Sequence, residues 1–98
     1  MEMKKRFERI QCADGFNMSV QAHRGAYCSP RSGVGPFTAV EVGFPSAREE
    51  LLMEFAESSD NPTETVYGWV PTKVILDVIT KHGGMIGGEL PSLKLGGE

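Results

Sequence analysis

A hairpin turn is indicated between two runs of alternating apolar and polar residues near the start of the chain. The tripeptide Ala13–Gly15 contains the Asp-Gly pair that favours such turns. A three-residue loop, with its glycine left-handed as a bulge, places Cys12 opposite Phe16. The next pair on the same face is then Ile10 and Met18, whereas a two-residue turn would set apolar against polar residues. We therefore predict an antiparallel hairpin with the three-residue loop, which places Cys12 in the core.

Two more strands are predicted further along the chain. Residues 37–44 alternate, with Val40, Val42 and Phe44 on one face. Residues 65–70 are rich in β-branched and aromatic side chains, which favour strands. Together with the hairpin, these segments supply four strands.

Two helices are predicted from capping residues and helical spacing. The segment Ser46–Glu49 fits a capping box, and a buried apolar stripe follows, so the first helix is expected over 47–57. The second helix has Pro71 at its first position and is ended by Gly83. This order of elements predicts an α+β fold, with a four-stranded antiparallel or mixed sheet and two helices packed on one face.

The length and composition predict one small globular domain. The chain has 98 residues, of which 40% are hydrophobic and 23% are charged. We assign residues 1–84 to a single domain and residues 85–98 to a glycine-rich tail. Whether Leu90, Leu93 and Leu95 of this tail dock on the core or on a neighbouring molecule stays open.

Charge and segment composition exclude several classes of function. The net charge of −3 argues against a protein that binds nucleic acid directly by neutralising phosphates. Residues 1–31 are net basic and residues 32–70 net acidic, an asymmetry that can steer a partner but is also typical of solvated surfaces. No apolar run long enough to span a membrane and no signal peptide is visible. We therefore expect a cytoplasmic protein without membrane contact, with both cysteines as free thiols.

Metal binding and catalysis are not expected. Cys12, His23, Cys28 and His82 are all the cysteines and histidines of the chain, and they lack the paired spacing of metal sites. Arginines near Cys28 would lower its thiol pKa, but nothing in the sequence places a base beside it. The acidic residues of the first predicted helix are typical of an exposed helix face. The glycine pairs follow a helix instead of opening one, so no phosphate loop and no cofactor are predicted.

The best candidate for a binding surface is the irregular segment 23–37. Within it, residues 24–36 contain three glycines and two prolines, and loops of this length are often functional. Arginine grips carboxylates and phosphates in a bidentate manner, and tyrosine gives a rigid contact surface. Trp69 and Tyr67 on a neighbouring strand could extend the patch, although a single tryptophan in a small domain is more often in the core. The predicted binding residues are Arg24, Tyr27, Ser29, Arg31, Trp69 and His82.

Four strings of residues resemble a group of small uncharacterised proteins of tailed bacteriophages and prophages. The resemblance covers about residues 10–84 and implies an accessory phage protein acting in the bacterial cytosol. It implies no activity and no residue roles. The strings are Asp14–Ala22, Tyr27–Arg31, Ala39–Ser46 and Val66–Pro71.

Three hypotheses for function follow. The first is a non-enzymatic module that binds and blocks a host macromolecule, by analogy with small phage proteins that inhibit defence complexes such as CRISPR effectors. Arg24 and Arg31 would form ion pairs and Tyr27 would be the aromatic anchor, or the acidic helix would mimic DNA. The second is an oligomer that sequesters an anionic nucleotide, using the same arginines and His82, with a ring stacked on the base. The third is a minor structural protein that forms a homo-oligomer.

Overall fold

The hairpin forms in the register expected from its apolar pattern. The computed structural model describes residues 6–94. Strand β1 (Ile10–Cys12) pairs antiparallel with β2 (Asn17–Gln21), and Ile10 lies opposite Met18. The Cys12 amide donates to the carbonyl of Phe16 at 2.9 Å. The glycine of the turn has a φ of 101°, so the three-residue loop with a left-handed glycine is confirmed.

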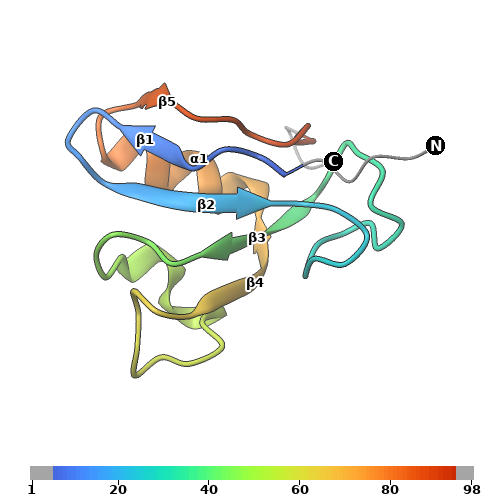
Figure 1. Cartoon of the computed structure of the whole chain (residues 1–98), viewed down its shortest axis with the longest axis horizontal. Coiled ribbons are helices and arrows are strands. Elements are labelled where there is room, and N and C mark those ends of the chain that lie inside the picture. The colour runs from blue at the N-terminus through green and yellow to red at the C-terminus, as the bar shows by residue number, and fades with distance from the viewer. Residues whose placement is uncertain (1–5, 95–98) are drawn as a thin grey trace.

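The sheet has five antiparallel strands instead of the four expected (Figure 1). The remaining strands are β3 (Ala39–Gly43), β4 (Val66–Pro71) and β5 (Met85–Gly87). Their order across the sheet is β4-β3-β2-β1-β5. The α+β class and the antiparallel alternative are therefore confirmed, and the strand count was one short.

The fifth strand lies in the segment expected to be a loose tail. Backbone groups, and not an apolar pattern, attach this segment: the amide of Ala13 donates to Gly84 at 2.9 Å, and that of Glu89 donates to Glu8 at 3.1 Å. Beyond β5, Leu90 and Leu93 are half-buried against the core. Leu95, also considered for docking, lies outside the described residues. The chain from 85 to 94 is thus part of the sheet and its packing.

The first helix is shorter than expected and begins differently. It is a 3₁₀ helix, η1 (Glu50–Phe55), and the side chain of Glu49 caps it by accepting from the amide of Leu51 at 2.9 Å. Ser46, expected to be the cap, instead pairs with Asn17: its amide donates to the Asn17 carbonyl at 2.8 Å, and its hydroxyl accepts from the Asn17 amide at 3.0 Å. Ser46 therefore continues the sheet, and the helix starts later.

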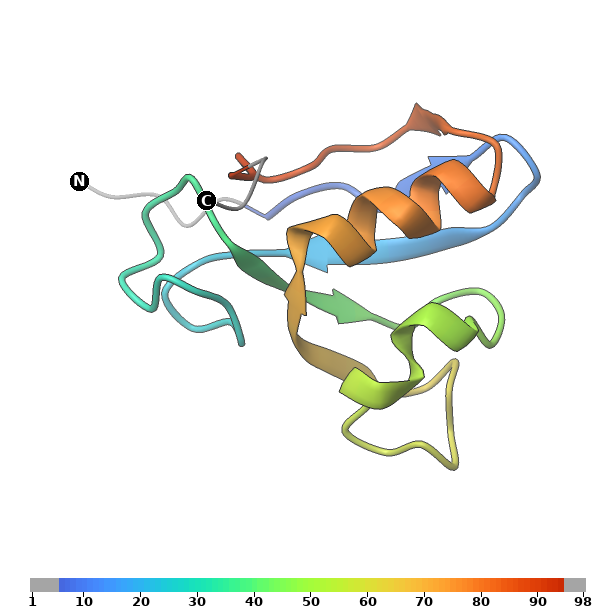
Figure 2. The ribbon, with the colours of Figure 1, turned by 180° about the vertical axis from the view of Figure 1, so that it is seen from behind.

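The second helix matches its expected extent closely. It is α1 (Thr72–Lys81), with Pro71 one position before its first residue and Gly83 in the left-handed region at a φ of 92°. Both helices lie on the same side of the sheet, as expected (Figure 2). Within residues 6–94, no helix has the length and apolar character needed to cross a membrane.

The core lies between the sheet and α1, which leaves the opposite face of the sheet without a helix. Val20 and Val40 point into the core and are fully buried. Because strand side chains alternate, Ser19, Gln21 and Glu41 point to the other face. We call this second side the open face; α1 lies behind the sheet when it is seen from this side (Figure 1). Its side chains are polar where those of the core face are apolar.

Substituting the glycines that flank β5 tests its position. Gly88 has a φ of +94°, and a Cβ there would lie 2.6 Å from the Cα of Ile10. Gly84 has a φ of +99°, and a Cβ there would meet nothing within 4 Å. Both alanine variants incur the left-handed cost of about 1–2 kcal/mol, but only Gly88→Ala also forces β5 from β1. We expect it to lower the free energy of unfolding by roughly 3 kcal/mol, measured by urea denaturation. Equal losses in the two variants would contradict the placement of β5.

Candidate functional site

Two of the predicted binding residues meet on the surface. The rings of Tyr27 and Trp69 stack with centroids 4.9 Å apart and an interplanar angle of 22°. The amide of Trp69 donates to the carbonyl of Tyr27 at 3.0 Å, and the amide of Tyr27 donates to Glu41 Oε1 at 3.0 Å. The side chain of Tyr27 covers Gly68, where an added Cβ would lie 3.3 Å from it. These contacts fix the loop on β4, and we call the two rings the aromatic stack.

The aromatic stack is exposed although its rings are large. Tyr27 is 41% exposed and Trp69 is 51% exposed, whereas Tyr67, which was also expected to extend the patch, is fully buried in the core. Trp69 also has a φ of 50°, in the left-handed region where a bulky side chain is an outlier. Such a conformation costs about 1–3 kcal/mol and persists where the surrounding structure enforces it, which is commonly at a functional site.

Phe44, just past the end of β3, has the same unusual combination. Its φ is 49°, and its side chain is 51% exposed. Alternation put this ring on the same face as Val40 and Val42, which are fully buried, but the ring is exposed because the positive φ turns the chain out of the strand. In the described part of the chain, Phe44 and Trp69 are the non-glycine residues with positive φ.

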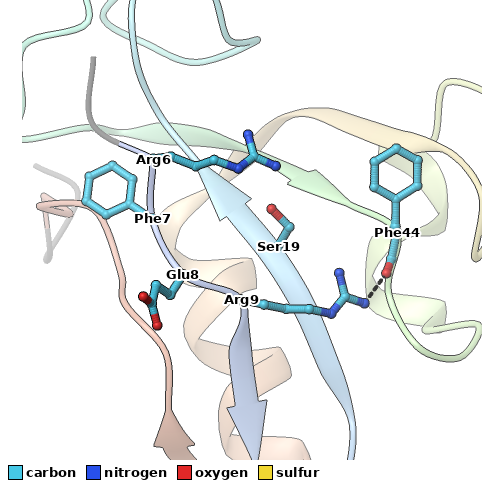
Figure 3. A pocket seen from close by; sticks show the side chains of 6 residues that line it. All are labelled: Arg6, Phe7, Glu8, Arg9, Ser19 and Phe44. Carbon is cyan, nitrogen blue, oxygen red and sulfur yellow. Dashed lines mark hydrogen bonds between the residues drawn. The ribbon is translucent and has the colours of Figure 1, made fainter. Parts of the chain in front are cut away.

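A hollow of about 490 Å³ lies beside Phe44 on the open face (Figure 3). A second hollow of about 230 Å³ shares Arg6, Ser19 and Phe44 with it. The sequence analysis did not single out Arg6 or Arg9 as binding residues. The basic start of the chain was the available indication, but it is equally typical of a solvated strand. The residues that line the first hollow are Arg6, Phe7, Glu8, Arg9, Ser19 and Phe44.

The other predicted residues of the loop have different surroundings. Arg24 and Arg31 are exposed, and neither guanidinium has an ion-pair partner within residues 6–94. Ser29 forms an isolated bridge with Ala39, to whose carbonyl its amide donates at 3.0 Å. The neighbouring Cys28 is fully buried, and its Sγ donates to the carbonyl of His23 at 3.3 Å. Cys28 is therefore part of the core, and the two arginines are free to meet a partner.

His82 lies apart from the other predicted binding residues. Its ring stacks on Phe16 with centroids 4.1 Å apart. Nδ1 is 2.7 Å from Asp14 Oδ2, in the hairpin turn, and Nε2 is 2.7 Å from Glu49 Oε1. β2 runs from this turn to the loop that holds Tyr27, so His82 and the aromatic stack lie at opposite ends of the strand. Within one chain, His82 is therefore not brought together with the loop arginines, and the nucleotide site expected between subunits stays a prediction.

The groups around His82 form an ionic cluster centred on a buried carboxylate. The Glu49 side chain is only 1% exposed, and it also receives a 2.7 Å contact from Lys81 Nζ. Burial raises the pKa of Glu49. Hydrogen bonds from Lys81, the Leu51 amide and His82 have the larger combined effect and bring this pKa below its usual value. Burial lowers the pKa of His82, but hydrogen bonds with Glu49 and Asp14 raise it above its usual value. The cluster therefore favours the charged forms of Glu49 and His82.

Asp14 and Cys12 respond to the same surroundings in opposite directions. The hydrogen bond from the Phe16 amide, followed by that from His82, lowers the pKa of Asp14. Burial, followed by the charge of Asp14, raises the pKa of the Cys12 thiol. Within residues 6–94, no group of three or more histidine, cysteine, aspartate and glutamate side chains could hold a metal ion.

The comparisons with known proteins assign no family. Neither the protein-family models, nor the curated proteins, nor the solved structures give a match to this chain. The resemblance to phage proteins therefore stays a prediction, and the function has to be argued from the surface itself.

Because of the ionic cluster, the free energy of unfolding should fall both when the pH is raised and when it is lowered. The raised pKa of His82 stabilises the fold below about pH 6.5, and this contribution is lost as the pH rises through the folded-state value. The lowered pKa values of Glu49 and Asp14 stabilise it above about pH 4, and this contribution is lost as the pH falls. We expect urea denaturation to show maximal stability between these limits. In His82→Gln, the decline that begins just above about pH 6.5 should disappear, whereas the later decline caused by the raised pKa of the Cys12 thiol should remain. An unchanged decline just above about pH 6.5 would contradict the role of this histidine.

The strain at Phe44 can be measured with a pair of truncations. Phe44→Gly and Phe44→Ala remove the same ring, but only glycine adopts a φ of 49° without strain. We expect the glycine variant to be more stable than the alanine variant by about 1 kcal/mol. Thr38 is exposed and its φ is not positive. There the alanine variant should be the more stable one, because glycine only adds conformational entropy to the unfolded chain. The same order at both positions would show that Phe44 is not strained.

Proposed function

We propose that this chain is a non-enzymatic binding module that recognises a partner protein through the aromatic stack. The observation that carries the proposal is Trp69, whose large ring stays half-exposed on a left-handed backbone. A chain optimised for stability alone would place glycine there. Tryptophan, tyrosine and arginine are also the residues enriched at the energetic centres of protein interfaces.

The loop around the stack provides charged contacts for the same partner. Arg24 and Arg31 are exposed on the segment that carries Tyr27, so their guanidinium groups can pair with carboxylates at the edge of the contact. Charges in this position mainly affect association rate and specificity, while the rings supply affinity. We therefore propose a partner surface with an apolar depression flanked by acidic side chains.

We propose a non-enzymatic function because the chemically reactive side chains already have structural partners. Both ring nitrogens of His82 are 2.7 Å from carboxylate oxygens. The Cys28 thiol is buried and donates to a backbone carbonyl. These contacts explain why both residues are present without requiring a reaction.

The resemblance to phage proteins supplies the biological part of the proposal. In that setting, the partner is a host macromolecule of the bacterial cytosol, and binding blocks its activity. A defence complex such as a CRISPR effector is one such target. This part rests on the resemblance, and the surface argument holds without it.

Truncation of Trp69 tests this function. We expect the tagged full-length chain to capture one stoichiometric protein from bacterial lysate at moderate salt, identified by mass spectrometry. Trp69→Ala should reduce capture at least about 30-fold, the effect of losing an interface centre worth about 2 kcal/mol. The matched control is Leu51→Ala, which truncates an equally accessible apolar residue in η1 (42% exposed).

The melting curves of both variants must remain normal for this comparison. Equal capture by Trp69→Ala and the unmodified chain would overturn the aromatic stack as the contact. Capture that disappears at high salt in all variants would instead favour the acidic helix as a DNA mimic.

A further inference from the structure

The hollow beside Phe44 is lined by two arginines that extend over β2 from the same side (Figure 3). Arg6 and Arg9 come from the segment that precedes β1, and their guanidinium groups extend to either side of Ser19 (Figure 3). The ring of Phe44 stands on the far side of the same space. Glu8 also lines the hollow, but its carboxylate points away from the two guanidinium groups. The charged groups that face the space are therefore cationic.

The segment that carries the arginines is held in place by its backbone. The Gln21 side chain, which is 8% exposed, accepts from the Phe7 amide at 3.0 Å and donates to the Phe7 carbonyl at 2.6 Å. On the other side, the Glu8 amide donates to Glu89 Oε1 at 3.0 Å. This clamp fixes the backbone from which both arginine side chains start, which reduces the ordering needed when a ligand binds.

Arg9 is fixed further by its own hydrogen bonds. Its Nε donates to Asn17 Oδ1 at 2.6 Å, and its Nη2 donates to the carbonyl of Phe44. The remaining group, Nη1, has no partner within residues 6–94. The position of Arg9 is thus coupled to that of Phe44, and one edge of its guanidinium stays free for a ligand.

The donors around the hollow suit an anion. Arg6 is exposed and has no ion-pair partner in the part of the chain that the structure describes. The Ser19 hydroxyl accepts from Gln21 Nε2 at 3.0 Å, which leaves its proton available to donate. Two guanidinium groups and a hydroxyl supply the hydrogen-bond donors that a phosphate or carboxylate needs.

The adjoining hollow suits a planar base. It continues from the first hollow past the exposed ring of Phe44 to Gln21, His23 and Glu41. An aromatic ring offers its face for stacking to any base. Glu41 uses Oε1 to accept from the Tyr27 amide, and its Oε2 has no partner among residues 6–94. That oxygen can accept a hydrogen bond from an amino group of the base.

We propose that the two hollows bind a nucleotide, with its phosphate between Arg6 and Arg9 and its base against Phe44. This site uses none of the residues of the aromatic stack, so it goes beyond the proposed protein contact. The number of cationic side chains favours a small ligand, because two guanidinium groups neutralise few phosphates. A free mononucleotide and the end of an oligonucleotide share this chemistry.

Titration of the full chain by ¹⁵N–¹H NMR tests the proposal. Adenosine 5′-monophosphate should cause saturable shifts of the Arg9 Nε–Hε signal and of the Ser19 and Phe44 amides. Adenosine and inorganic phosphate should each bind at least about tenfold more weakly, because each lacks one half of the contacts. A deoxyadenosine pentanucleotide with a 5′-phosphate distinguishes the two sources: tighter binding than the monophosphate assigns the site to oligonucleotide ends, and weaker binding assigns it to free nucleotides.

Three variants locate the ligand. Arg6→Ala and Phe44→Ala should weaken binding of adenosine 5′-monophosphate at least about tenfold, the loss expected for one charge-assisted contact or one stacked base. The charge-matched control is Arg31→Ala, which should leave binding unchanged. The dissociation constant expected of the site is well below about 10 mM. Absence of saturable shifts at that nucleotide concentration would therefore overturn the proposal. So would an equal loss in Arg31→Ala, which would indicate only diffuse electrostatic attraction.

The protein contact and the nucleotide site can fail separately. Trp69→Ala should retain nucleotide binding, because its ring lines neither hollow. Arg6→Ala should retain the captured partner, because Arg6 is not in contact with the aromatic stack. Loss of nucleotide binding in a folded Trp69→Ala variant would overturn the assignment of the ligand to this site.

Discussion

The buried carboxylate of Glu49 joins three parts of the chain that the sheet alone would not hold together. It caps η1, accepts from Lys81 at the end of α1 and meets His82, whose other ring nitrogen lies against Asp14 in the hairpin turn. Removing one partner from such a buried cluster leaves an uncompensated charge, which is far costlier than the net worth of the pair. The cluster therefore fixes both helices on one face of the sheet and leaves the other face open.

Apart from Trp69 in β4, the open face receives its aromatic and cationic groups from irregular segments. β2 and β3 present small or polar side chains there, whereas the rings and guanidinium groups come from residues 6–9, from the loop around Tyr27, and from Phe44 just beyond β3. A rigid sheet beneath irregular segments is a common arrangement for binding, because the scaffold fixes the position of groups that the segments can vary. The left-handed backbone of Phe44 and Trp69 shows that exposure of these rings costs stability.

The sequence predicted those parts of the fold that side-chain patterns determine. The β1–β2 register and α1 follow from alternation, helical spacing and capping residues close in sequence. β5 was missed because backbone hydrogen bonds attach it, and these leave no pattern in the residue types. The cap at Ser46 was wrong because the competing partner, Asn17, lies 29 residues away. At the site, Tyr27 was expected near Trp69. The hollow formed by Arg6, Arg9 and Phe44 was not expected, because it depends on how segments distant in sequence cross the sheet.

The distribution of charge shows why the net value is a poor guide to the ligands of this protein. The net charge of −3 argues against binding of anions by the chain as a whole. Two of the acidic residues that contribute to it, Glu50 and Glu54, belong to η1, which lies with α1 on the far side of the sheet (Figure 2). At physiological ionic strength, exposed charges further apart than about 8 Å are largely screened from one another. An anion above Ser19 therefore experiences the nearby guanidinium groups of Arg6 and Arg9 far more than the acidic helix.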